Sequence, residues 1–157
     1  MQNDERPVWE GTPSQFVNLK VWLIASFVVL LALYLAATMR WEWIALATVP
    51  IAWSAWTHLQ TKHHVYTLST ERLQLTRGVL SKRHDDLELY RVKDTTLEEP
   101  LALRMFGLAD ILLDTSDRST PQVRIHAIRD AKHVREILRT NIEELRTKKR
   151  VREVDFE

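Results

Sequence analysis

The sequence predicts a membrane-anchored α+β protein: a two-helix transmembrane hairpin, then an antiparallel β-sandwich or open barrel, then a closing α-helix. The uncharged run from Val21 to Met39 is long enough to cross a bilayer. From position 64 to 128, apolar and polar residues alternate in short segments, which is typical of half-buried strands. From position 130 the apolar spacing becomes helical.

Residues 1–20 form a polar segment that we expect on the cytoplasmic side. The prolines and the glycine between Pro7 and Ser14 predict turns or extended chain. A polar, partly acidic lead followed by so long an apolar run is unlike a cleaved signal peptide. We therefore expect the first helix to remain in the mature protein.

The predicted hairpin covers residues 21–57. Its first helix would span about 28 Å at 1.5 Å per residue. The second apolar run, from Trp43 to Leu59, is shorter and contains Pro50, which predicts a kink. The break at Arg40–Glu42 is so short that the helices must be antiparallel. Tryptophans lie near the ends of both runs, as interfacial anchors do: Trp22, Trp41, Trp43 and Trp56.

The alternative to a membrane hairpin is a buried helical pair inside a soluble core. A domain this small could hardly cover a run of that length, so the membrane interpretation is preferred. Cations gather on the domain side of the hairpin: Lys20, Lys62, Arg72, Arg77, Lys82 and Arg83. The tip has only Arg40. The positive-inside rule therefore predicts two spans in the inner (plasma) membrane with both termini in the cytoplasm.

Residues 58–64 are predicted to be a linker that sets how far the domain stands from the membrane. The domain itself covers residues 65–147. Strands are expected at 64–68, 72–76, 86–90, 92–97, 108–114 and 123–128. Gly78 marks a bend before a loop at Ser81–His84, and Pro100 and Gly107 bracket a short helical turn. An amphipathic helix follows, capped by Asp130. Residues 148–157 are a charged tail that we expect to be mobile.

Several short motifs resemble one known family. They are Trp9-Glu10-Gly11-x-Pro13-Ser14, Tyr66-x-Leu68-x-x-Glu71-Arg72-Leu73, Gly78-Val79-Leu80-Ser81, Leu87-x-Leu89-x-Arg91-Val92, Phe106-Gly107-Leu108-Ala109 and Ile128-Arg129-Asp130-Ala131. Together with the two-helix anchor they resemble the membrane-anchored bacterial pleckstrin-homology (PH) domain family, from about Trp9 to about Arg146. The resemblance implies a PH-like β-sandwich capped by a C-terminal helix at the cytoplasmic face. It provides no catalytic residue.

Composition excludes several kinds of site. The chain has no cysteine, so thiol nucleophiles and cysteine-ligated metals are excluded. Its three glycines are isolated and form no phosphate-binding loop. His63 and His64 would point to opposite faces of a strand, so they cannot chelate a metal together. We therefore expect no catalytic residue, metal, cofactor or small-molecule substrate. A net charge of +1 gives no reason to expect nucleic acid binding.

Two basic clusters are the candidate contact sites for lipid or a partner: Lys82 and Arg83 in the predicted loop, and Lys148, Lys149 and Arg150 after the last helix. Both could equally be a solvated hairpin tip and a solvated helix end. The leading hypothesis is a non-catalytic, membrane-tethered cytoplasmic module that binds or assembles with a membrane protein or with another copy of itself. The alternative is a peripheral domain that senses anionic lipid through these cations.

Overall fold

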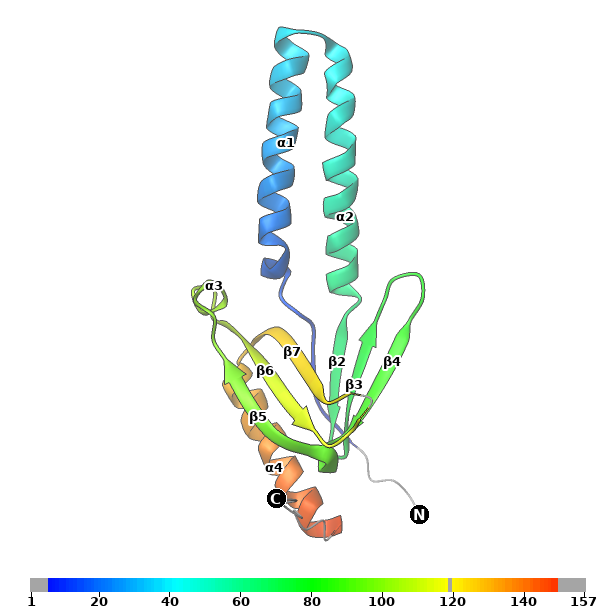
Figure 1. The fold of residues 1–157 in the computed structure, drawn as a ribbon, viewed down its shortest axis with the longest axis vertical. Coiled ribbons are helices and arrows are strands. Elements are labelled where there is room, and N and C mark those ends of the chain that lie inside the picture. Colours follow the sequence, from blue (N-terminus) through cyan, green and yellow to red (C-terminus); the bar gives the residue numbers. More distant parts are fainter. Residues whose placement is uncertain (1–5, 119, 150–157) are drawn as a thin grey trace.

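A helical hairpin stands on a β-domain in the computed structural model, which describes residues 6–118 and 120–149 (Figure 1). The strands are β1 (Pro7–Gly11), β2 (Val65–Ser69), β3 (Arg72–Arg77), β4 (Arg83–Glu88), β5 (Val92–Glu98), β6 (Leu108–Thr115) and β7 (Gln122–Arg129). The α-helices are α1 (Leu19–Thr38), α2 (Thr48–Lys62), α3 (Leu101–Arg104) and α4 (Ala131–Lys149). Three 3-10 helices complete the set: η1 (Gln15–Asn18), η2 (Trp41–Ala47) and η3 (Leu89–Arg91).

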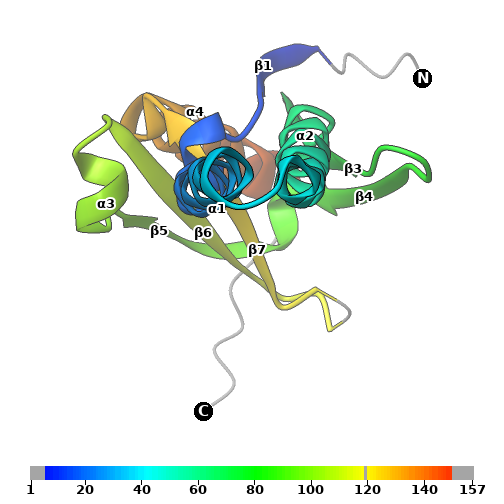
Figure 2. The ribbon, with the colours of Figure 1, turned by 90° about the horizontal axis from the view of Figure 1, so that it is seen from above.

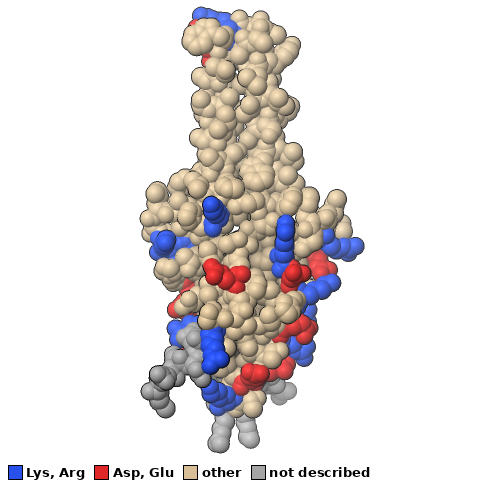
Figure 3. All heavy atoms as spheres, turned by 180° about the vertical axis from the view of Figure 1, so that it is seen from behind, with Lys and Arg blue, Asp and Glu red and all other residues tan. Residues whose placement is uncertain are grey.

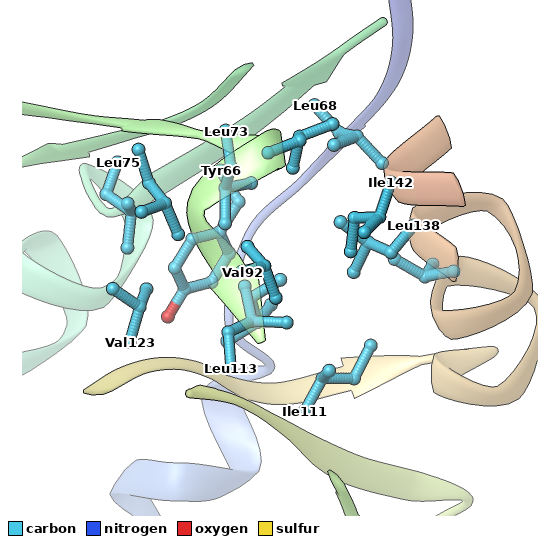
Figure 4. Packing of buried hydrophobic residues seen from close by; sticks show 14 of the residues in the cluster. Tyr66, Leu68, Leu73, Leu75, Val92, Ile111, Leu113, Val123, Leu138 and Ile142 are labelled. Atoms are coloured by element: carbon cyan, nitrogen blue, oxygen red, sulfur yellow. The ribbon is translucent and has the colours of Figure 1, made fainter. Parts of the chain in front are cut away.

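The β-domain consists of two antiparallel sheets that face one another. One has the order β1-β2-β3-β4 and the other the order β5-β6-β7. Alternate side chains of both sheets point inward, among them Tyr66 and Leu73 from the first and Leu113 from the second (Figure 4). Leu138 and Ile142 of α4 join the same core. The predicted antiparallel sheets with a closing C-terminal helix are confirmed.

The hairpin is inserted between β1 and β2 of one sheet. In that sheet Trp9 pairs with Leu68 and Gly11 pairs with Tyr66, so the residues on either side of the hairpin lie side by side. Trp9 also packs against the core. The sequence predicted turns or extended chain here and placed residues 1–20 outside the domain. The structure instead makes Pro7–Gly11 an edge strand of it.

Of the residues that the structure describes, one helix is long and apolar enough to cross a membrane: Gln15–Thr38, which comprises η1 and α1. The predicted second span is not confirmed. The second arm of the hairpin is divided into η2, of 7 residues, and α2, of 15. Pro50 is the third residue of α2, in the first turn, where N–H groups have no acceptor within the helix. The predicted mid-helix kink is therefore absent, and α1 and α2 run side by side (Figure 1).

Little chain separates the hairpin from the domain. The sequence predicted a linker at 58–64, but α2 continues to Lys62 and β2 begins at Val65. Only His63 and His64 lie between them. On the other side, η1 begins four residues after the end of β1. Both connections are therefore too short to let the domain stand away from the base of the hairpin.

Candidate functional site: the junction of hairpin and domain

A buried asparagine joins the two helices at their base. The Asn18 side chain donates hydrogen bonds to Thr61 Oγ1 (2.8 Å), to Gln15 Oε1 (3.0 Å) and to the Thr57 carbonyl (3.4 Å). Asn18 is only 8 % exposed, although it lies just before the apolar helix α1. These bonds fix η1 against the last turns of α2. The two arms therefore leave the domain as one unit.

A buried carboxylate holds the strand that supports this base. The Asp110 side chain, on β6, is 2 % exposed. It accepts hydrogen bonds from the Ala127 N–H (2.7 Å) and from Nδ1 of His126 (2.8 Å), and it pairs with Arg124 (3.3 Å). Ala127 has a positive φ of 47°, at an irregularity in the β6–β7 register. The Ala127 carbonyl accepts a hydrogen bond from the Ser14 N–H (2.9 Å), just before η1 begins. Asp110 therefore supports the residue that holds the start of η1.

His64 occupies the opposite connection, between α2 and β2. Its Nε2 accepts a hydrogen bond from Arg77 Nε (3.1 Å), and its ring lies 4.8 Å from that of Tyr66. Burial lowers the pKa of His64 from 6.5 to about 4, with Arg77 as the second cause and His126 as the third. Burial raises the pKa of Tyr66, whose hydroxyl accepts from the His126 N–H (3.2 Å). Both side chains are therefore neutral near pH 7.

Acidification is expected to destabilise this connection through His64. The folded chain binds a proton at His64 less readily than the unfolded chain, so stability is complete above pH 6.5 and falls as the pH drops towards 4. Allowing for partial exposure, we expect a loss of about 1–2 kcal/mol between pH 7 and pH 5. Thermal unfolding of the full chain in detergent at both pH values would measure it.

The matched variant for that measurement is His64→Gln. Glutamine keeps an acceptor for Arg77 but has no group that titrates in this range. The drop in stability between pH 7 and pH 5 should therefore be smaller in the variant by about 1–2 kcal/mol. An equal drop in both chains would show that His64 is not the titrating group.

Lys82 and Arg83 of the first predicted basic cluster lie at the opposite end of the β-domain from Lys148 of the second (Figure 1). Lys82 and Arg83 are exposed beside the β3–β4 turn, near the hairpin, and Arg83 pairs with Asp85 at 2.9 Å. Lys148 is exposed at the end of α4, which points away from the hairpin (Figure 1). Lys149 is the last residue of α4, and Arg150 lies outside the described residues. The structure therefore does not bring Lys82 and Arg83 to the same surface as Lys148.

The predicted interfacial tryptophans fall at two levels. Trp41 and Trp43 lie in η2 at the tip of the hairpin, where they are exposed. Trp22 and Trp56 lie towards the base, and the Trp22 ring stacks at 6.3 Å on the ring of His58. The tryptophans therefore lie near both ends of the hairpin, and their role as interfacial anchors stays a prediction.

An apolar groove runs between α1 and α2. It has a volume of about 500 Å³, and its lining combines the small residues Ala25, Ser26 and Ser54 with four large ones, Trp22, Val29, Leu30 and Ile51. The Ser54 hydroxyl is buried and makes no hydrogen bond to any residue that the structure describes. Small residues that leave space between helices allow another helix backbone to approach closely.

The chemistry of the junction is that of binding and support. Within residues 6–118 and 120–149, no three His, Asp or Glu side chains are grouped so that they could hold a metal ion. Asp110 is bonded to His126, Arg124 and the Ala127 N–H, and Arg77 donates to His64. Sequence reasoning missed Asp110 and Asn18. The available signal for Asp110 was a single charged residue within the apolar stretch Leu108–Leu113.

The family model for the bacterial PH domain matches residues 16–142. The chain belongs to the bacterial PH domain family. The match includes the hairpin, every strand except β1 and most of α4. PH domains are generally non-catalytic binding modules. No curated protein and no solved structure matches the chain.

Proposed function

We propose that this bacterial PH domain protein is a membrane-tethered, non-catalytic assembly module. Its hairpin crosses the inner membrane twice, and its PH domain lies against the cytoplasmic face with both termini. The hairpin binds a membrane-spanning helix of a partner or of a second copy. The observation that carries this proposal is the apolar groove between α1 and α2, which has small side chains in its lining.

The length of the second arm supports two spans. A 3-10 helix rises about 2 Å per residue, so the 7 residues of η2 extend about 14 Å. The 15 residues of α2 add about 22 Å. The sum of about 36 Å exceeds a hydrocarbon core of about 30 Å.

The distribution of charge supports a cytoplasmic domain. Lys20 begins α1 and Lys62 ends α2, both at the base of the hairpin. At the tip, the Arg40 guanidinium pairs with Glu42 at 3.0 Å. The tip therefore has no net charge from this pair, whereas the base is positive. The positive-inside rule favours retention of the base in the cytoplasm.

Partner binding through the groove requires space beside Ala25 and Ser54. In the bilayer, helices associate by close packing and by interhelical hydrogen bonds, because lipid tails are as apolar as the helices. A partner helix in this groove would cover Ala25 and Ser26. The exposed apolar side chains on the remaining surface of the hairpin suit contact with lipid.

Filling the groove is expected to weaken the association. Ala25→Leu should lower the yield of co-purified partner, or of crosslinked dimer, by about tenfold, which corresponds to about 1.4 kcal/mol. The measurement is quantitative mass spectrometry of proteins that co-purify with the intact chain in mild detergent. Ala37→Leu is the matched control, because Ala37 is exposed on α1 outside the groove. Equal yields from both variants and the unmodified chain would contradict the proposal.

A further inference from the structure

Two loops of the domain expose large apolar side chains to an unusual degree. Leu80, in the β3–β4 turn, is 89 % exposed, and Met105, just after α3, is 82 % exposed. Both values exceed that of Trp41, the most exposed of the large hydrophobic residues in the hairpin, at 76 %. Leu101 at the start of α3 is similarly exposed. Side chains so apolar and so open to solvent indicate an interaction surface.

Strand register places the β3–β4 turn on the hairpin side of the domain. Val65, the first residue of β2 after α2, pairs with Thr76 near the end of β3. The turn that follows β3 is therefore beside the base of the hairpin. Gly78 has φ of 109°, and a Cβ there would meet the Ser81 carbonyl, so the turn is tight. A tight turn holds Leu80 at its tip.

A ring contact places the loop that contains α3, residues Leu101–Met105, beside the base of the hairpin, as the β3–β4 turn is. Phe106 stacks on Phe16, with ring centroids 4.2 Å apart and planes 18° apart. Phe16 belongs to the Gln15–Thr38 segment that is long and apolar enough to cross a membrane. The α3 loop therefore contacts the segment where it begins. From above, α3 and the β3–β4 turn flank the hairpin on opposite sides (Figure 2).

Cations accompany both loops. Lys82 and Arg83 follow Leu80, and Arg104 precedes Met105. With Lys20 and Lys62 at the helix bases, they lie where the apolar part of the hairpin meets the domain. Figure 3 shows basic side chains gathered at that boundary. An apolar tip flanked by cations matches the interface of a bilayer, where acyl chains lie below anionic headgroups.

We infer that Leu80 and the Leu101–Met105 loop insert into the bilayer that the hairpin crosses. The inference rests on the proposed membrane anchoring of α1 and goes beyond it. The domain is then held at three places, the hairpin and one loop on either side, and cannot rotate or lift from the surface. Its opposite end, with the end of α4, faces the cytoplasm. Contact with the lipid then determines which surfaces of the domain remain accessible to a partner.

Depth measurements with single labels test the inference. The chain has no cysteine, so Leu80→Cys and Met105→Cys can each accept one fluorophore in the full-length protein. The protein is placed in vesicles of phosphatidylcholine and phosphatidylglycerol that contain lipids with a nitroxide at acyl carbon 5 or 12. Both labels should lose at least half of their fluorescence to the carbon-5 nitroxide and less to the carbon-12 nitroxide.

Two further labelled variants distinguish a failure of loop insertion from a failure of membrane anchoring. Thr140→Cys, exposed on α4, should show no quenching. Leu30→Cys, near the middle of α1, should be quenched more by carbon 12. If Leu30→Cys is quenched but Leu80→Cys and Met105→Cys behave like Thr140→Cys, the loops do not insert and only this inference is overturned. If Leu30→Cys is also unquenched, the membrane anchoring fails as well. Crosslinking between copies through Leu80→Cys without quenching would assign the loops to a second copy and overturn it too.

Discussion

A chain that begins at Lys62 is expected not to form a stable monomer, although it contains every residue from β2 to α4. It lacks β1, which pairs with β2 at four register positions and supplies Trp9 to the core. Truncating a fully buried tryptophan costs about 3–5 kcal/mol, and the partly buried Trp9 is expected to contribute a part of that in addition to the lost β1–β2 pairing. A domain has only about 5–15 kcal/mol in total. The loss also exposes β2 as an unpaired apolar edge, which favours aggregation. Size-exclusion chromatography would detect the aggregation, and thermal melting would measure the loss of stability.

The matched control restores β1 without the hairpin. Gly11 and Tyr66 are register partners, so an Asn-Gly pair that joins them directly would form a two-residue β-turn. Residues 6–11 joined in this way to residues 66–149 should remain monomeric and melt cooperatively. If the chain from Lys62 onward melts at the same temperature as this joined chain, β1 is not required for the fold.

The role of β1 illustrates how far the sequence could predict this fold. Leu73 and Leu75 in β3, and the apolar stripe of α4, have strong periodicity, and their elements were predicted in the right order. Pro7–Gly11 has no alternation of its own, because it is a short edge strand with Trp9 as its only core contact. Its partner Val65–Ser69 comes more than fifty residues later in the chain. Pairing over that distance leaves no local pattern to detect.

The contacts at the junction of hairpin and domain could not be predicted from the sequence for a different physical reason. Hydropathy located the hairpin and its tryptophans, but it could not show that residues 58–62 continue α2. Polar residues such as His58 and Thr61 suggested a linker, whereas they form the last turns of a helix whose Thr61 meets Asn18. Hydrogen bonds between residues about forty positions apart depend on the fold. Likewise, exposure of Leu80 follows from the register of β3, which composition does not determine.

Replacing Asp110 with alanine is expected to lower the free energy of unfolding by about 3 kcal/mol. The carboxylate accepts from the Ala127 N–H and from His126, and it pairs with Arg124, at a site where it is almost fully buried. Its removal leaves the Ala127 N–H buried without an acceptor, which alone costs about 1–3 kcal/mol. Asp110→Asn keeps one acceptor oxygen and should lose less. Chemical denaturation of the full chain in detergent measures both changes.

Asp114→Ala is the matched control, and amide exchange tests the link to the hairpin. Asp114 lies on the same face of β6 but is only half-buried, and it accepts a hydrogen bond from the exposed Gln122 side chain. Its removal should therefore cost below about 0.5 kcal/mol.

Because the Ala127 carbonyl accepts a hydrogen bond from the Ser14 N–H, Asp110→Ala should also speed amide exchange at Ser14 more than at Leu75 in the other sheet. Uniform acceleration at both amides would mean that Asp110 stabilises the domain as a whole without specifically securing the entry to η1 and α1.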